Sequence, residues 1–273
     1  MDGIRKPAVA GLFYPGSSEE LEADVRKLLN ENKTDLIHES IFGLIAPHAG
    51  YMYSGRTAAY AYNLLEGKFY ETIVVIAPSH REYFPGISIY SGDAYETPLG
   101  KIPVNKELAN KLVEENENIF GGLIGHGDHE HSLEVQLPFL QTVLSGFSIL
   151  PIIIGDQSEA LINALAEALS KIYDEKMLII ASSDLSHFHK KSEARNLDDI
   201  VVSHINNLDS DSLLDDLNKN KCEACGGGPM LALLKAAKIN GFSKSKVLHV
   251  SDSGDTTGDN TGVVGYLSAV IYE

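Results

Sequence analysis

Two apolar segments that each run into a histidine constrain this chain more than any other feature. Residues 42–46 lead through one proline into His48, and residues 73–77 lead through Pro-Ser into His80. Short apolar runs of this kind are typical of buried strands, and open α/β folds bind their ligands just beyond the carboxyl ends of such strands. We therefore expect His48 and His80 to meet at one edge of a sheet and to begin a functional site there.

Strand-like and helix-like segments alternate along most of the 273 residues. The expected strands are residues 42–46, 72–77, 86–90, 147–154, 177–181, 246–251 and 263–272. The expected helices are residues 17–29, 55–65, 105–116, 158–172, 192–207, 210–218 and 227–239. Because several strands are apolar on both faces, the pattern predicts an α/β fold with a central, largely buried mixed sheet flanked by helices on both faces. No segment resembles a linker or a repeat, so we expect residues 1–273 to form a single domain.

Charge and hydropathy argue against several classes of function. The formal net charge is −16, and an acidic surface repels phosphate backbones, so general nucleic-acid binding is not expected. The sequence has no run of about 18 apolar residues, so no membrane-spanning helix is expected. The first seven residues lack the apolar core of a signal peptide. These features predict a cytoplasmic protein that binds neither nucleic acid nor membranes.

Histidines are concentrated at the ends of the expected strands and in loops. A lone histidine is more often a structural residue than a ligand, but strand ends that are far apart in sequence gather in space, as a site requires. The seven histidines in such positions are His48, His80, His126, His129, His131, His187 and His189. Their joint placement indicates a site that contains several imidazoles.

Several imidazoles in one place are best suited to binding a transition-metal ion. First-row metals bind neutral imidazole nitrogens together with a carboxylate or a thiolate. His48 and His80 would supply two nitrogens. The sequence offers four candidates for the anionic third ligand, namely Cys225, Asp184, Glu130 and Glu134. The residues alone leave this choice open.

His187 is the candidate acid/base residue. It follows Asp184 by three residues, so the two side chains would share one face if this segment forms a helical turn. A histidine near a metal but not bound to it is suited to proton transfer near neutral pH. We therefore expect Asp184 to orient His187 as a general acid or base.

Other catalytic patterns fit the sequence less well. Ser79 beside His80, or Ser182 and Ser183 near Asp184 and His187, would fit a hydrolase triad, but the Gly-x-Ser-x-Gly elbow is missing. The two cysteines stand in a Cys-Glu-Ala-Cys pattern that suits a redox pair or half of a zinc site. No second pair occurs, so four cysteines cannot hold a zinc ion within one chain. A single cysteine as a metal ligand is the more informative alternative.

Six segments, taken together and in this order, resemble the Memo family. They are Ala10-Gly-Leu-Phe-Tyr-Pro15, Ala46-Pro-His-Ala-Gly-Tyr-Met-Tyr-Ser-Gly55, Ala77-Pro-Ser-His80, His131-Ser-Leu-Glu-Val-Gln-Leu-Pro-Phe139, Ser183-Asp-Leu-Ser-His-Phe188 and Cys225-Gly-Gly-Gly-Pro229. This family includes the animal mediator of receptor-driven cell motility and the microbial proteins called AmmeMemoRadiSam system protein B. The short acidic chain looks like a microbial member.

The resemblance implies a fold and a set of ligands. Memo proteins resemble class III extradiol ring-cleaving dioxygenases, which are non-haem Fe(II) enzymes with two histidines and a glutamate on the metal. By this resemblance His48 and His80 match the two metal histidines, Cys225 matches the cysteine that Memo proteins carry as third ligand, and Asp184 and His187 match the pocket motif. Fe(II) is the expected metal, with Cu or Zn as alternatives. A thiolate in place of the glutamate changes the site, so ring cleavage does not follow from the fold.

Three functions remain open on this basis. The first is a non-haem iron or copper oxidoreductase that acts on an unidentified small molecule. The second is a recognition protein that binds a peptide or small ligand without turnover, as the signalling role of the animal relatives implies. The third is a zinc hydrolase with the same ligands and a bound water as nucleophile. The microbial association also implies a radical-SAM partner protein, while the sequence does not indicate an oligomeric state.

Overall fold

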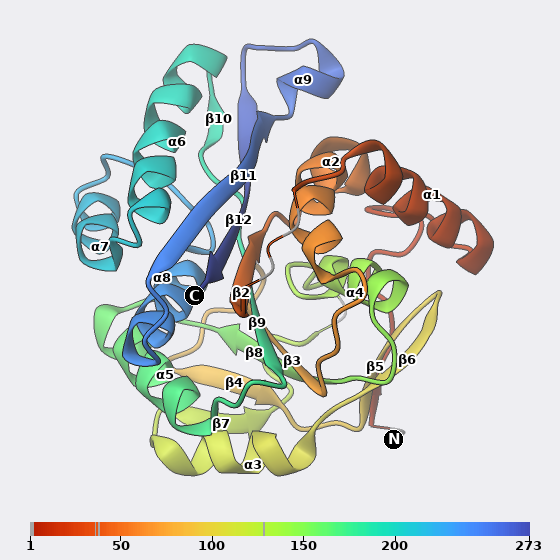
Figure 1. Cartoon of the computed structure of the whole chain (residues 1–273), viewed down its shortest axis with the longest axis vertical. Helices are drawn as coiled ribbons and strands as arrows, with labels where there is room; N and C mark the ends of the chain where they lie inside the picture. Colours follow the sequence, from red (N-terminus) through yellow and green to blue (C-terminus); the bar gives the residue numbers. More distant parts are fainter. Residues whose placement is uncertain (1–2, 36, 38, 128) are drawn as a thin grey trace.

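The computed structural model describes residues 3–35, 37, 39–127 and 129–273 (Figure 1). Within these residues, a nine-stranded sheet forms the centre of the molecule in the order β10-β12-β2-β9-β3-β8-β4-β7, with β11 paired to β12. Its strands are β2 (Ile41–Ala46), β3 (Thr72–Pro78), β4 (Ile87–Tyr90), β7 (Ile119–Gly122), β8 (Ser148–Ile154), β9 (Met177–Ser182), β10 (His187–His189), β11 (Lys244–Asp252) and β12 (Val263–Tyr272). Strands from both ends of the chain therefore share one sheet.

The middle of this sheet is parallel and its flanks are antiparallel. β2, β9, β3 and β8 run in the same direction. β12 pairs antiparallel with β2, and β4 pairs antiparallel with β8. The parallel strands are buried along both faces, which explains their continuous apolar sequences. Their carboxyl ends consequently lie at one edge, and this edge carries the histidines.

Helices cover both faces of the sheet. Alternate residues of β3 point to opposite sides, so that Val74 and Ile76 join one apolar cluster while Ile73 and Val75 join the other. The first cluster includes residues of α3 (Lys106–Glu115), α5 (Glu159–Ile172), α6 (Lys191–Asn206), α7 (Ser210–Asn218) and α8 (Gly227–Ile239). The second includes residues of α1 (Ser18–Glu31), α2 (Tyr51–Tyr62) and α4 (Leu137–Val143). The predicted α/β architecture with a mixed sheet between two helical layers is confirmed.

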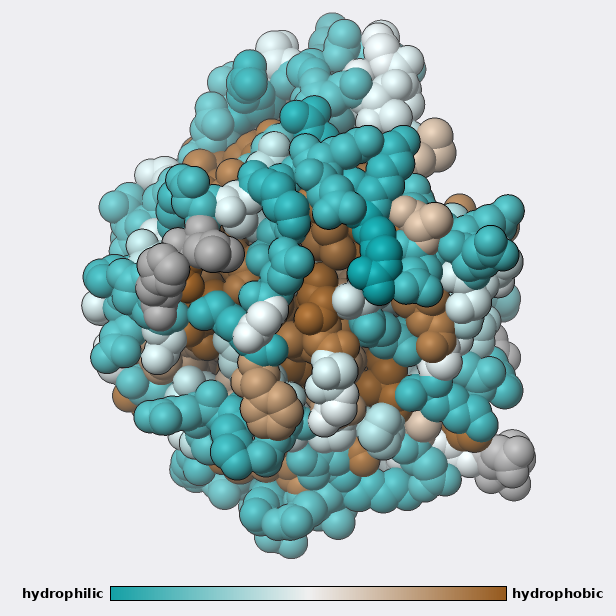
Figure 2. All heavy atoms as spheres, turned by 45° about the vertical axis from the view of Figure 1, so that its right-hand side comes forward, coloured by the Kyte–Doolittle hydropathy of each residue, from teal (hydrophilic) through white to brown (hydrophobic). Residues whose placement is uncertain are grey.

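Smaller elements complete the described part of the chain. β1 (Ile4–Arg5), β5 (Ala94–Thr97) and β6 (Gly100–Pro103) form a separate three-stranded sheet. Two 3₁₀ turns, η1 (Asn63–Leu65) and η2 (Glu134–Gln136), and the short helix α9 (Gly254–Thr257) lie between larger elements. Hydrophilic residues cover most of the face drawn in Figure 2, and hydrophobic residues show mainly in the recesses between them. In the described ranges, every helix is too short or too polar to cross a membrane.

Local structure differs from the sequence-based expectation in two places. The glycine-rich stretch 121–127 predicts a loop, which residues 123–127 form, but Gly121 and Gly122 belong to β7, where they pair with β4 at the edge of the sheet. A helical turn over residues 184–187 would have placed Asp184 and His187 on one face, but the segment before His187 is irregular and His187 begins β10. In both places pairing with a strand that is distant in sequence decides the conformation, and local residue preferences do not report such pairing.

Candidate metal centre

His48 and His80 lie at the same edge of the sheet, as the sequence predicts. His48 follows β2 and His80 follows β3, and only β9 separates these two strands. The centroids of the two imidazole rings are 5.0 Å apart, with the rings nearly perpendicular. His48 is buried, whereas His80 is partly open to solvent. Two parallel strands therefore bring together two imidazoles that are 32 positions apart in the sequence.

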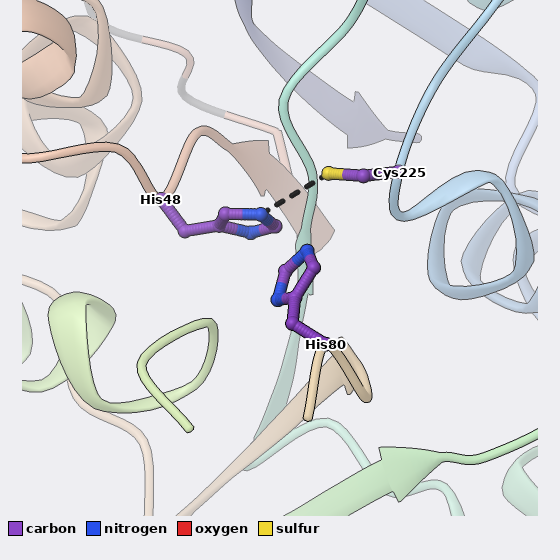
Figure 3. A group of neighbouring side chains, drawn as sticks. All are labelled: His48, His80 and Cys225. Carbon is purple, nitrogen blue, oxygen red and sulfur yellow. Dashed lines mark hydrogen bonds between the residues drawn. The ribbon is translucent and has the colours of Figure 1, made fainter. Parts of the chain in front are cut away.

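Cys225 joins these histidines from the loop that precedes α8. Its sulfur lies 3.1 Å from Nε2 of His48, although the two residues are 177 positions apart in the sequence. One ligand atom from each of His48, His80 and Cys225 can be chosen so that all three lie within 4.8 Å of one another. Figure 3 shows the three side chains converging from three separate segments. This group could hold a metal ion.

The backbone of Asp184 fixes the position of Cys225. The Cys225 N–H donates to the Asp184 carbonyl at 3.2 Å, and the Asp184 N–H donates to the Cys225 sulfur at 3.3 Å. Burial, together with the nearby Asp184 carboxyl, raises the pKa of the Cys225 thiol well above its usual range. Without a cation the thiol therefore stays protonated, and a metal ion must displace this proton in order to bind the sulfur.

Ser182 determines which nitrogen of His48 carries the hydrogen. The Ser182 hydroxyl donates to the Ser132 carbonyl at 2.6 Å and accepts a hydrogen bond from the Gln136 amide at 2.7 Å. Because its one hydrogen is used, Ser182 must accept from Nδ1 of His48, which lies 2.9 Å away. Nε2 of His48 then keeps its lone pair and faces Cys225. Burial lowers the pKa of His48 far below its usual value, so the ring is neutral.

Glu130 determines which nitrogen of His80 carries the hydrogen. Its carboxylate accepts the His80 backbone N–H at 2.6 Å and contacts Nδ1 of the same ring at 3.2 Å. The backbone N–H groups of His131 and Ser132 also donate to it, both at 3.0 Å. Burial opposes the charge, but these hydrogen bonds outweigh it and hold the pKa of Glu130 below its usual range. With Nδ1 bonded to a carboxylate, Nε2 of His80 is the nitrogen available to a metal.

His131 adds a third imidazole to the group. Its ring is nearly parallel to that of His80, with centroids 4.9 Å apart, and lies 5.6 Å from the ring of His48. Burial and the neighbouring His80 lower the pKa of His131 to about 4. His80, Glu130 and His131 form a second group whose ligand atoms lie within 4.8 Å of one another. The sequence marks His131 only as one of several loop histidines.

Asp184 lies against His48 rather than His187. Its carboxylate accepts the His48 backbone N–H at 2.7 Å and lies 4.0 Å from Nε2 of that ring. Burial raises the pKa of Asp184 to about 7, although the hydrogen bonds from the backbone N–H groups of His48 and Ala49 act against this shift. The expectation that Asp184 orients His187 is not supported, because the helical turn that would place them on one face does not form.

His187 lines the same cavity as the candidate ligand Cys225. This cavity has a volume of about 410 Å³, and Leu185 and Glu223 also line it. The His187 backbone N–H donates to the Glu223 carboxylate at 3.4 Å. Burial lowers the pKa of His187, which favours the neutral ring at pH 7. The sequence gives no sign of Glu223 as a neighbour, because this residue belongs to a segment 36 positions further along the chain.

Glu134, one of the four candidate ligands, has a structural role. Its carboxylate forms a buried ion pair with Arg5 and accepts hydrogen bonds from the Tyr14 hydroxyl and from the backbone N–H of Ala8 and Val9. These contacts occupy its oxygens and hold the N-terminal segment against η2, the 3₁₀ turn before α4. Arg5 also donates to the carbonyl of Glu130, so the same network supports the residue that holds His80.

The remaining candidates lie outside the group of three. His126 is buried, with Nδ1 2.5 Å from the Tyr95 hydroxyl and Nε2 3.2 Å from the Ser88 carbonyl, which is a structural environment. His189 contacts the Glu223 carboxylate at 3.0 Å. Cys222 is a buried free thiol, so the Cys-Glu-Ala-Cys pair is not a disulfide here. Of the candidate third ligands, Cys225 is the one grouped with both His48 and His80.

The donor set fits a first-row transition metal. Two neutral imidazoles and one thiol converge, and each imidazole has its Nδ1 engaged by an oxygen atom. Hydrogen bonds of this kind orient histidine ligands in metalloproteins and raise their basicity. Soft sulfur and imidazole ligands suit Fe, Cu and Zn rather than Mg or Ca.

Comparison with known proteins gives a consistent family assignment. The model of the Memo-like protein family matches residues 5–270. A MEMO1 family protein of Thermoplasma volcanium is 38% identical over 268 residues, which is 98% of each chain. One from Methanobrevibacter smithii is 37% identical over 281 aligned positions, covering 98% of this chain and 99% of the relative.

A solved structure supports the fold independently. The crystal structure of an uncharacterised protein from Escherichia coli K12 aligns with a TM-score of 0.57 at 17% identity, covering 84% of this chain and 98% of that one. Such low identity supports the architecture alone and says nothing about activity. The family model and the relatives match nearly the whole length of the chain, and these matches are more specific. On these grounds the chain belongs to the Memo family.

Proposed function

We propose that this chain is a metal-dependent oxidoreductase of the non-haem type, in which His48, His80 and Cys225 hold one transition-metal ion. The observation that carries the proposal is the convergence of three ligand atoms within 4.8 Å from three distant segments. Fe(II) is the first candidate, because the Memo family resembles non-haem iron dioxygenases, and Cu and Zn are the alternatives. When bound, such an ion supplies Lewis acidity and, for iron or copper, one-electron chemistry.

The residues around the three ligands have separate tasks in this proposal. Ser182 and Glu130 hold the two imidazoles in the tautomer that directs Nε2 to the metal. His187 is neutral at pH 7 because burial lowers its pKa, so its ring can accept a proton from a molecule in the adjoining cavity. Asp184 has a pKa of about 7 and can hold a proton next to His48. His48 is almost completely buried, so water is kept away from its side of the three ligands.

Metal analysis of protein purified without oxygen tests the proposal. We expect about one iron ion per chain, as a three-residue ligand set with an open position requires. A His48→Ala, His80→Ala double variant should lose this metal. His204→Ala serves as the matched control, because His204 on α6 pairs with Asp216 on α7 and takes no part in the group of three. Unchanged metal content in the double variant would contradict the proposal, and zinc with activity indifferent to oxygen would favour a hydrolase.

A further inference from the structure

The cavity beside Cys225 and His187 has the size of a small-molecule site. Its volume is about 410 Å³, within the usual range of ligand pockets of roughly 300–1,000 Å³. It lies among α5, α7, α8 and the segment that leads into β10. Because a candidate metal ligand and the candidate acid/base residue both line it, a molecule in this cavity would lie next to both.

Part of the cavity lining is apolar. It includes the side chains of Ile162, Leu185, Leu214, Leu217 and Leu231, beside the amides of Gln157, Asn218 and Asn220. Ile162, Leu185 and Leu231 are almost completely buried in the main apolar cluster, whereas Leu214 and Leu217 pack against this cluster and are partly buried. The apolar surface open to a ligand therefore comes mainly from Leu214 and Leu217, and the cluster beneath keeps it in place. The bound molecule should therefore have an apolar part.

The charge of the cavity comes from one carboxylate. Glu223 lines the space with its side chain 42% exposed, and none of the described lining residues is a lysine or an arginine. Two lysines of the neighbouring segment, Lys219 and Lys221, are paired with Asp215 and Asp216. An anion near Glu223 would find no lysine or arginine among the described lining residues, whereas an ammonium group would find an opposite charge.

The carboxylate is also held in place. Both of its oxygens lie 3.0 Å from Nε2 of His189, and one accepts the His187 backbone N–H. A carboxylate offers about four lone-pair directions, so these contacts leave acceptor capacity for a further donor. Glu223 is thus positioned before a ligand arrives, and less conformational entropy is lost on binding.

We propose that this cavity binds a small molecule in which a protonated amine is joined to an apolar group. The amine pairs with Glu223 and the apolar part packs against Leu214 and Leu217. This arrangement holds the molecule beside His187 and Cys225. That the molecule is also the substrate rests on the proposed function, but its binding does not.

Two probes of similar size and opposite charge test this inference. Binding of 2-phenylethylamine and of 3-phenylpropionate is measured by calorimetry and by the shifts of labelled Leu and Ile methyl signals. We expect the amine to bind about tenfold more tightly or better, which corresponds to one favourable charge contact in place of a repulsive one. If 3-phenylpropionate binds the unaltered chain as tightly as 2-phenylethylamine or more tightly, the inference is overturned, and no variant is needed to decide this.

A pair of glutamate variants then assigns the preference to one residue. Both Glu223 and Glu193 lie against His189, but Glu193 is 63% exposed and does not line the cavity. Glu223→Gln should remove most of the preference for the amine, and Glu193→Gln should leave it unchanged. An unchanged preference in Glu223→Gln, or an equal loss in both variants, contradicts the role given to Glu223.

The same samples distinguish this inference from the proposed function. Metal content is measured in each, and Glu223→Gln should bind metal as the unaltered chain does. If the unaltered chain binds the amine selectively but holds no metal, the proposed oxidoreductase fails while the cavity assignment stands. If metal binds and the amine does not, the cavity assignment fails alone.

Discussion

At the scale of single residues, the site depends on which nitrogen of each histidine faces the ligands. Ser182 and Glu130 settle this for His48 and His80 through hydrogen bonds to Nδ1. A histidine with the wrong tautomer would present an N–H to the metal and could not bind it. The partners of the imidazoles are therefore as important for metal affinity as the imidazoles themselves.

Replacing Ser182 tests this dependence. In Ser182→Ala, Nδ1 of His48 loses its acceptor and the ring is free to take the other tautomer, so metal affinity should fall about 10- to 100-fold. Competition titration with a chelator of known affinity measures the change. Ser268→Ala is the control, because the Ser268 hydroxyl is buried without a hydrogen-bond partner among the described residues. An affinity equal to that of the unaltered chain would mean that Ser182 does not set the tautomer.

The candidate ligands could be predicted from the sequence only in part. His48 and His80 follow apolar strands, so their meeting is a consequence of parallel pairing and was predictable without a relative. The third ligand was not, because a thiolate and a carboxylate are equally suitable by chemistry, and the sequence offers Cys225, Asp184, Glu130 and Glu134. What separates them is tertiary structure, since Arg5 and Tyr14 occupy Glu134 while Cys225 arrives through the loop before α8. Only the family resemblance selected Cys225 in advance.

At the scale of elements, the position of His48 depends on the close packing of β2 against β9 and α8. Gly43 of β2 lies opposite Ile179 of β9. A Cβ atom at this position would come within 2.4 Å of the Ile179 carbonyl oxygen and 2.5 Å of Leu233 on α8. The absence of a side chain therefore lets strand and helix pack at this distance, and His48 lies five residues further along the same strand and loop.

Gly43→Ala should destabilise the fold for this reason. The backbone of a central strand cannot move aside easily, so we expect a loss of about 1–3 kcal/mol or more in the free energy of unfolding. Urea denaturation measures it. Gly127→Ala is the control, since its Cβ would have no atom within 4 Å, and its stability should change by less than about 1 kcal/mol. Equal stability of the two variants would contradict the close packing at Gly43.

Element positions followed from apolar patterns where the strands are buried on both faces. The expected segments 72–77 and 177–181 correspond to β3 and β9 almost residue for residue. The short strands β7 and β10 were not predicted. Each has at most four residues and forms only by pairing with a strand that is distant in sequence. The strand β10 matters for function, because the His187 backbone N–H donates to Glu223 there and Asp184 does not share a helical face with His187.

At the scale of the whole molecule, buried neutral histidines link stability to pH. His126 donates from Nε2 to the Ser88 carbonyl and accepts from the Tyr95 hydroxyl, so only its neutral form suits this position. Burial lowers the pKa of His126 to about 3, whereas the unfolded chain has a value near 6.5. The unfolded state therefore binds more protons between these values. The stabilisation is complete above about pH 6.5 and is lost progressively as the pH falls toward the folded value.

A comparison at two pH values measures this contribution. Between about pH 7 and pH 5, His126 alone should reduce the free energy of unfolding by about 2 kcal/mol. His126→Gln lacks the titrating group, so the same acidification should destabilise this variant by about 2 kcal/mol less. The other histidines contribute equally to both proteins and cancel in the difference. Identical pH dependence in the two chains would show that His126 is not held neutral by burial.

The central claim is that one metal ion binds His48, His80 and Cys225, and X-ray absorption at the metal edge tests it most directly. Protein purified without oxygen should show two nitrogen ligands at about 2.1 Å and one sulfur ligand at about 2.3 Å, taking distances typical of such sites. Cys225→Ser should remove the sulfur signal and keep the nitrogen signals, while Cys222→Ser should leave the spectrum unchanged. A bound metal without a sulfur ligand in the unaltered chain, or a sulfur signal that survives in Cys225→Ser, would contradict the account.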